Sequence, residues 1–237
     1  MSESTLRIGL VLPDVMGTYG DGGNALILRQ RARMRGIDAE IVEITLDDEV
    51  PESLDVYTLG GAEDNAQRIA TRHLQRYPGL QRAAEAGHPV LAICAAIQVL
   101  GHWYETSAGE RVAGISMLDL TTSPREARAI GELVTTPLID GLSQPLSGFE
   151  NHRGATTLGP AAKPLARVRD GVGNGDGAGV EGAVQGSVIS TYMHGPLLAR
   201  NPELADHLLE KATGTALAPL DLPQVDRLRK ERISAAR

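Results

Sequence analysis

The chain has 237 residues with a net charge of −7, and 42% of them are hydrophobic but only 3% aromatic. This length suffices for one α/β domain with a sizeable core, whereas an acidic chain with few aromatic residues is a poor candidate for nucleic-acid binding. The sequence has no apolar run of membrane-spanning length, no signal-peptide pattern at Met1 and only one cysteine, so we expect a cytoplasmic protein without an intrachain disulfide.

The first hundred residues alternate between apolar strands and helical segments. We expect strands over residues 6–13, 37–44, 55–61 and 89–95, and helices over 24–36, 62–87 and 95–101. Gly36 ends the first helix, and Pro78 interrupts the second. This alternation predicts a mostly parallel sheet flanked by helices.

The pattern changes between residues 114 and 190. Short strands are expected over 115–122, 129–138, 145–152 and 164–171, forming an antiparallel extension above one edge of the sheet. The glycine-rich segment 171–182 lacks a following helix, so it predicts a flexible hairpin loop rather than a dinucleotide site. We predict one domain over residues 1–220 and a charged, helix-prone tail over 221–237, either disordered or docked on a partner.

Cys94 is the strongest candidate for a chemical centre. It lies where the buried strand of PVLAICAAIQVLG turns directly into a helix, the geometry of a nucleophile elbow. Backbone N–H groups of the helix and its dipole favour the reactive thiolate. A lone cysteine is otherwise often an inert core residue, so this segment by itself leaves both interpretations open.

His194 is the best candidate for the base that such a nucleophile needs. It follows a β-branched run, and a new helix is expected behind Asn201 and Pro202. Because catalytic groups of parallel α/β sheets gather at the carboxyl ends of strands, His194 and Cys94 can share one edge. His152 in SGFENHRGATTL is the main rival for this role. The remaining histidines are expected to be surface, packing or turn residues.

Gly60 and Gly61 follow the third expected strand. Glycines allow close backbone approach, and their N–H groups are candidates for an oxyanion site opposite Cys94. A Gly-Gly pair after a strand is weak evidence by itself, since most such pairs are only turns.

Four ordered segments together resemble a known family. ICAAIQVLG is similar to the nucleophile elbow of cobyric-acid-synthase-type class I glutamine amidotransferases, and LGGAEDNAQ to their glycine-rich oxyanion strand. DVMGTYGDGGNALIL, and GFENHRGAT with TYMHGPLLARNPELAD, resemble the glutaminase subunits (GatD) of lipid II isoglutaminyl synthases. The resemblance runs from about residue 6 to about residue 209 and implies the class I amidotransferase-like, flavodoxin-like fold.

The resemblance also implies roles for individual residues. Cys94 and His194 would be catalytic, and Gly61 and Ala95 would supply oxyanion N–H groups. Arg128 matches a family position expected to bind the α-carboxylate of glutamine, although a surface arginine is equally compatible with the sequence. The further substrate-binding candidates are Gly60, Gln98, Asn151 and His152. No metal ligand is predicted.

The sequence shows two departures, one from this family at the elbow and one from class I amidotransferases generally, which the cobyric-acid branch shares. Ala95 and Ala96 replace glycines, which would cost on the order of 1 kcal/mol if either needed a positive φ, and Ile97 replaces a tyrosine. Class I amidotransferases generally carry an acidic residue two positions after the histidine, where this chain has Pro196. The sequence therefore suggests no carboxylate partner for His194, and we expect a partner subunit to donate one and to activate an otherwise poor glutaminase.

The implied partner is a Mur-ligase-like subunit (MurT) in a heterodimer. No ATP-binding signature is found in the sequence, so ATP and Mg²⁺ are expected on that partner, and no cofactor is expected in this chain. The complex would amidate the D-glutamate α-carboxyl of lipid II during peptidoglycan synthesis. Two alternatives remain: a stand-alone hydrolase of the same fold, such as a peptidase or deglycase, and a non-catalytic regulatory scaffold.

Overall fold

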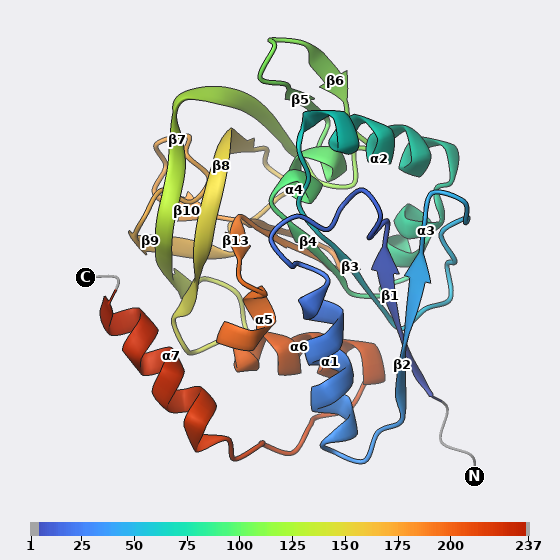
Figure 1. The fold of residues 1–237 in the computed structure, drawn as a ribbon, viewed down its shortest axis with the longest axis vertical. Helices are drawn as coiled ribbons and strands as arrows, with labels where there is room; N and C mark the ends of the chain where they lie inside the picture. Colours follow the sequence, from blue (N-terminus) through green and yellow to red (C-terminus); the bar gives the residue numbers. More distant parts are fainter. Residues whose placement is uncertain (1–4, 236–237) are drawn as a thin grey trace.

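The computed structural model describes residues 5–235, and a mainly parallel sheet forms its centre (Figure 1). The strand order is β11-β12-β4-β3-β1-β2, and only the β11–β12 pair is antiparallel. The strands are β1 (Leu6–Val11), β2 (Ala39–Ile44), β3 (Val56–Leu59), β4 (Val90–Ile93), β11 (Ala183–Gln185) and β12 (Val188–Thr191). Every residue of β3, β4 and β12 is buried, as expected of central strands covered on both faces.

Two groups of helices lie on different sides of this sheet (Figure 1). One group is α1 (Gly23–Arg33), α5 (Leu197–Arg200) and α6 (Pro202–Thr213), which pack together. The other is α2 (Asp64–Arg76), α3 (Gly79–Glu85) and α4 (Ala95–Leu100). The expected strands and helices of the first hundred residues are confirmed, including the break at Pro78 and the left-handed Gly36, whose φ is +77°.

The antiparallel extension is built differently from the sequence prediction. Its strands are β5 (Trp103–Glu105), β6 (Arg111–Ala113), β7 (Leu120–Pro137), β8 (Leu146–Leu158), β9 (Ala166–Asp170), β10 (Val180–Glu181) and β13 (Met193–His194). The strand expected over 115–122 is wrong for residues 115–119, which lie in a loop, and residues 120–122 together with the strand expected over 129–138 fall in one 18-residue strand, β7. A register shift between Pro124 and Ala129 disturbs its pairing with β8 and obscures the period-two pattern in the sequence.

The glycine-rich segment joins β9 to β10 as a hairpin, but hydrogen bonds anchor it. Asn174 is fully buried and exchanges two side-chain hydrogen bonds with the backbone of Gly182. The carboxylate of Glu150 accepts the N–H groups of Val172 and Gly173. The predicted hairpin is confirmed, and its two ends are held by polar contacts that a composition dominated by glycine does not reveal.

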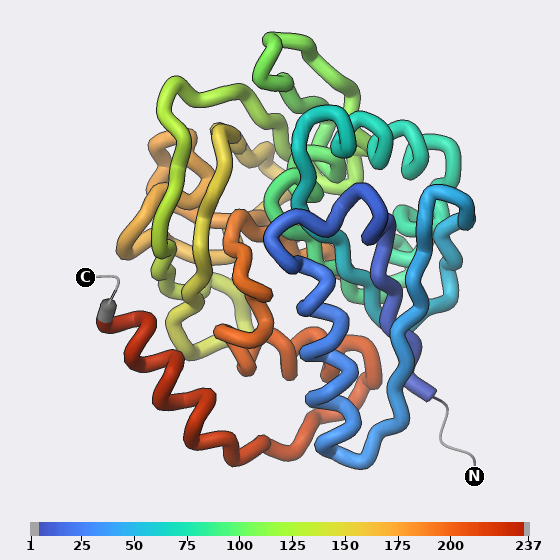
Figure 2. The backbone as a smooth tube through the Cα atoms, in the orientation of Figure 1, coloured from blue at the N-terminus to red at the C-terminus, as the bar shows by residue number. Residues whose placement is uncertain are grey.

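The charged tail forms helix α7 (Pro223–Ala235), which runs along one side of the molecule (Figure 2). The guanidinium of Arg229 donates to the carbonyl oxygens of Pro145 and Arg200 and ties the helix to the domain. Residues 236 and 237, the end of the expected tail, lie outside the described residues. None of the described helices is both long and apolar enough to cross a membrane.

The connections of the parallel sheet determine where a site can form. From β1 the chain passes outward to β2 and then returns to β3 on the other side of β1. Such a reversal opens a crevice at the carboxyl ends of the two diverging strands. The loop after β1 and the loop after β3 meet there, and Thr18 and Gly61 form an antiparallel bridge between them.

Candidate active site

Cys94 occupies a sharp turn between β4 and α4. Its backbone angles are φ 54° and ψ −110°, a strained conformation for a non-glycine residue. Such strain is typical of a nucleophile elbow, in which the turn holds the side chain above the sheet edge. Ala95 and Ala96 lie in the helix and neither has a positive φ. Replacing the family glycines with alanine therefore adds no left-handed strain, because the strained position is Cys94 itself.

His194 lies just beyond the carboxyl end of β12, as predicted. It belongs to β13, which pairs with β8, and it is followed by Gly195 with a φ of +157°. Gly61, two residues after the end of β3, lies next to both His194 and Cys94. A Cβ atom added to Gly61 would lie 3.0 Å from Cε1 of His194 and 3.3 Å from Cβ of Cys94. The fold thus brings the predicted nucleophile and base together around Gly61, where any side chain would crowd both of them.

The expectation that His194 lacks a carboxylate partner in this chain is wrong. Both carboxylate oxygens of Asp21 lie 3.0 Å from Nδ1 of His194. Asp21 belongs to the loop between β1 and α1, 173 residues away in the sequence. This loop reaches His194 because it emerges at the crevice beside β3. The carboxylate partner therefore need not come from the position two residues after the histidine.

The surroundings of His194 favour its charged form. Burial by itself lowers the pKa of the imidazole, but the hydrogen bond to Asp21 and the proximity of Cys94 outweigh burial and raise the pKa to about 10. Nε2 makes no hydrogen bond among the described residues, so its contact with the thiol is looser than a formed hydrogen bond. Such loose geometry is common at catalytic sites before substrate binds.

The predicted oxyanion role of Gly61 does not match the arrangement of its backbone. The N–H of Gly61 donates to Oδ2 of Asp21 at 2.8 Å and is therefore already engaged. Gly60 lies against the backbone of Met16, where an added Cβ would approach the carbonyl oxygen to 2.3 Å. The N–H of Ala95 has no acceptor among the residues that the structure describes, as expected at the first turn of a helix. Ala95 remains a predicted oxyanion donor.

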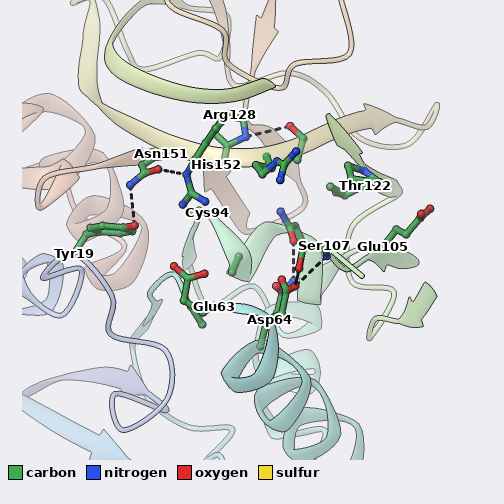
Figure 3. A pocket seen from close by; sticks show the side chains of 17 residues that line it. Tyr19, Glu63, Asp64, Cys94, Glu105, Ser107, Thr122, Arg128, Asn151 and His152 are labelled. Carbon is green, nitrogen blue, oxygen red and sulfur yellow. Dashed lines mark hydrogen bonds between the residues drawn. The ribbon is translucent and has the colours of Figure 1, made fainter. Parts of the chain in front are cut away.

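A cavity of about 280 Å³ opens beside Cys94 (Figure 3). Its wall contains Cys94, Ala95, Gln98, Arg128, Asn151 and His152 among the predicted residues, but not Gly60, Gly61 or His194. Sequence reasoning did not select the other polar lining residues, which include Tyr19, Glu63, Asp64, Gln67 and Arg153. Cys94 thus connects the cavity with the buried imidazole behind it.

Three side chains form a row along one side of the cavity (Figure 3). Nε of Arg128 donates to Oδ1 of Asn151 at 2.5 Å, and Nδ2 of Asn151 donates to the Tyr19 hydroxyl at 2.8 Å. The Tyr19 ring then meets His194 edge-on, with ring centroids 4.8 Å apart. Arg128 therefore lines the cavity with its Nε hydrogen-bonded to Asn151, and its role in substrate binding stays a prediction.

His152 also lies at the cavity but is held away from a role as base. Its ring stacks on Tyr192 with centroids 3.8 Å apart, and Nδ1 bonds to the carbonyl oxygen of Gly154. Its Nε2 is 3.6 Å from a carboxylate oxygen of Glu150. Gln98, another predicted site residue, accepts a hydrogen bond from Gln67. The position of His152 is thus consistent with lining the pocket, and His194 is the histidine beside Cys94.

Glu181 supports the segment that leads to His194. The fully buried carboxyl accepts the Thr191 hydroxyl at 2.8 Å and the Tyr192 N–H at 2.7 Å. Burial raises its pKa to about 7 in spite of these hydrogen bonds, with a smaller contribution from the charge of Glu150. The carboxyl therefore holds its proton to a higher pH in the folded chain than in the unfolded chain.

Replacing Glu181 with glutamine should stabilise the fold at alkaline pH. Since the folded pKa lies above the unfolded value, the stability associated with protonation is present below about pH 4.5 and is lost as the pH rises through about 7. Glutamine keeps an acceptor oxygen and stays neutral, so the free energy of unfolding should rise by about 1–3 kcal/mol at pH 8 and change little at pH 4. Urea unfolding of both proteins at the two pH values measures this, and an equal effect at both would contradict it.

The chain is similar to known glutamine amidotransferases over most of its length. The model of the CobB/CobQ-like glutamine amidotransferase domain matches residues 7–202. The GatD subunit of lipid II isoglutaminyl synthase (glutamine-hydrolysing) from Staphylococcus aureus is 35% identical, over 93% of this chain and 90% of that protein. The GatD subunit from Streptococcus pneumoniae is 32% identical, over 87% of this chain and 80% of that protein.

Solved structures show the same fold at low sequence identity. A crystal structure of a glutamine amidotransferase superimposes with a TM-score of 0.57 at 18% identity, over 87% of this chain and 98% of that one. PurLQS from Thermotoga maritima gives a TM-score of 0.55 at 15% identity, over 89% of this chain and 97% of the other. The expected class I amidotransferase-like fold is thereby confirmed. The chain belongs to the CobB/CobQ-like family of glutamine amidotransferases.

Proposed function

We propose that this chain hydrolyses L-glutamine through a thioester on Cys94. The sulfur forms a bond to the side-chain carbonyl carbon of glutamine while the N–H of Ala95 stabilises the oxyanion. The C–N bond then breaks, and the imidazolium of His194 gives its proton to the departing amine, which leaves as ammonia. Water, deprotonated by His194, attacks the thioester, the C–S bond breaks, and glutamate leaves.

The observation that carries this proposal is the arrangement of three side chains: Cys94 lines the cavity, His194 lies behind it, and Asp21 contacts the far nitrogen of His194. A strained thiol, a buried imidazole and a carboxylate on the opposite ring nitrogen are the parts that nucleophilic acyl transfer requires. An ordinary buried cysteine would need none of them. The same contacts disfavour the alternative of a non-catalytic scaffold.

The polar wall of the cavity suits free glutamine as the substrate. Arg128 lines the cavity and would bind the α-carboxylate, while Asn151 accepts a hydrogen bond from its Nε. The carboxylates of Glu63 and Asp64 line the same cavity and offer a counter-charge for the α-ammonium group. A cavity with both signs of charge fits an amino acid zwitterion better than an apolar substrate.

The relatives indicate what happens to the ammonia. Both GatD relatives are named as subunits of a glutamine-hydrolysing lipid II isoglutaminyl synthase. By that similarity, the ammonia passes to a Mur-ligase-like subunit, which binds ATP and Mg²⁺ and amidates the D-glutamate α-carboxyl of lipid II. The heterodimer would work in the cytoplasm, at the inner face of the membrane where lipid II is present.

The test is amidation of lipid II by this chain together with its Mur-ligase-like subunit. With ATP and Mg²⁺, the complex should amidate lipid II from either glutamine or ammonium salts. A complex carrying Cys94→Ser should use ammonium but not glutamine, because only the release of ammonia is removed. If the subunits do not associate and the chain alone hydrolyses peptides or other amides, the stand-alone hydrolase would be the better assignment.

Since Asp21 belongs to this chain, we no longer expect a carboxylate from the partner to be necessary. Glutamate formation by the isolated chain should therefore be measurable, in contrast to the expectation from the sequence. Assays with and without the Mur-ligase-like subunit decide between the two views. An absolute requirement for an acidic residue of the partner would instead support the expectation that the partner donates the carboxylate.

A further inference from the structure

Asp21 is buried among groups of the proposed reaction. The residue is 2% exposed, and its side chain is completely covered. One carboxylate binds two partners: both oxygens contact Nδ1 of His194, and Oδ2 also accepts the N–H of Gly61. The loops after β1 and β3 and the strand carrying His194 therefore converge on Asp21.

The charge of Asp21 has one cationic partner among residues 5–235. The ion pair joins Asp21 to His194, and no lysine or arginine of the described chain lies within ion-pair distance of its carboxylate. A buried carboxylate is costly unless it is paired and hydrogen-bonded. This arrangement therefore favours a positive charge on the imidazole. An aspartate with a purely structural role would not need to contact His194.

The contact also determines which ring nitrogen is free. A carboxylate only accepts hydrogen bonds, so Nδ1 must carry the hydrogen when it bonds to Asp21. In the neutral ring, Nε2 is then the nitrogen with a lone pair, and it makes no hydrogen bond among the described residues. The Tyr19 ring lies edge-on against the imidazole and shields the pair from one side.

We propose that Asp21 is the positioning residue of His194, holding the tautomer and the ring orientation that direct Nε2 to Cys94. It thus takes the place of the acidic residue that class I amidotransferases generally carry two positions after the histidine. The inference rests on the proposed glutaminase function and assigns to Asp21 a specific role within it. By binding the Gly61 N–H as well, Asp21 ties the orientation of the base to the loop after β3.

The titratable groups that face His194 are Asp21, Cys94 and Tyr19. Removing the carboxylate eliminates a cause that raises the pKa of His194, whereas burial, which lowers it, remains. The pKa of His194 should consequently fall from about 10 when Asp21 becomes neutral. An amide at this position also allows its NH₂ to donate to Nδ1, which favours the wrong tautomer.

Three variants of the full-length chain test the proposal. Asp21→Asn keeps the shape and removes the charge, and Asp21→Glu keeps the charge on a longer side chain. Asn24→Ala is the matched control, because Asn24 is also buried near the start of α1 but accepts the N–H of Leu198 instead of contacting His194. Thermal unfolding of all three separates loss of folding from loss of function.

The readouts are kcat and KM for glutamine, the rate of Cys94 alkylation by iodoacetamide at pH 7, and the pH titration of His194 by NMR. Asp21→Asn should lower kcat on the order of 10²–10⁴-fold with a smaller change in KM, slow alkylation and lower the pKa of His194. Asp21→Glu should recover part of kcat and of the titration shift. Asn24→Ala should lower only the unfolding temperature.

Two results would overturn the proposal. One is a folded Asp21→Asn chain with the kcat, alkylation rate and His194 titration of the unmodified protein. The other is an Asn24→Ala chain that loses kcat equally and shifts the same titration, which would indicate a general effect of the loop. If the unmodified chain hydrolyses no glutamine even together with its Mur-ligase-like subunit, the proposed function fails, but alkylation and NMR still report whether Asp21 controls His194.

Discussion

Replacing Cys94 with serine is expected to reduce glutamine hydrolysis by on the order of 10⁴-fold or more while leaving the fold intact. A serine hydroxyl does not provide the accessible anion that a thiol beside an imidazolium provides, so the first bond to the substrate cannot form efficiently. The side chains are similar in shape, and the strained backbone of Cys94 is set by the turn between β4 and α4 rather than by sulfur. Glutamate formation and circular dichroism of the variant measure the two parts of this prediction.

A second variant separates the thiol from the geometry of the elbow. Ala96→Gly restores a family glycine without touching the sulfur, and because Ala96 is helical and buried the change should cost stability by roughly 1 kcal/mol. Its glutaminase activity should remain close to that of the unmodified chain. A folded Cys94→Ser chain with undiminished hydrolysis would remove Cys94 from the mechanism.

The elbow and the position of His194 could be predicted from the sequence because parallel α/β topology constrains both. A buried strand that turns into a helix at Cys94, and a β-branched run ending before His194, place both groups at the carboxyl edge. Residues that meet at such an edge need not be close in the sequence. Local patterns therefore sufficed to place Cys94 and His194 at this edge, whereas their catalytic roles were implied only by the family resemblance.

Asp21 could not be found in this way. TYGDGGN reads as a turn, and aspartate is common in turns without any catalytic role. What places Asp21 beside His194 is the reversal of strand order between β2 and β3, which brings the loops after β1 and β3 together. An acidic residue in a loop beside this switch point is the signal that could have suggested it.

The antiparallel extension was the least predictable part of the fold. The strands β5 and β6 have three residues each, too few to show a period-two pattern. In β7 the register shift after Pro124 interrupts the alternation, so one strand resembles two. The buried polar groups that support it, such as Glu150 and Asn174, are typical of exposed loops in a sequence and gain their partners only in the folded structure.

Replacing His194 with alanine should lower kcat on the order of 10³-fold or more, comparably to the loss of Cys94, because a nucleophile and its base act as one unit and their effects do not add. The double variant with Cys94→Ser should consequently be little worse than either single variant. His152→Ala should instead raise KM about tenfold, equivalent to 1.4 kcal/mol of binding, since His152 lines the cavity but its Nδ1 is bonded to Gly154. Steady-state kinetics of the three variants provide the comparison.

The stacking of His152 on Tyr192 requires one more control, because removing a buried ring also leaves a cavity in the core. His152→Phe keeps an aromatic ring at this position and removes both nitrogens. If it retains kcat and raises KM, the imidazole of His152 contributes to binding, and the base must be another group. The assignment of His194 would be wrong if His152→Phe abolished turnover in a folded chain while His194→Ala changed only KM, since the base would then lie on β8 and not behind Cys94.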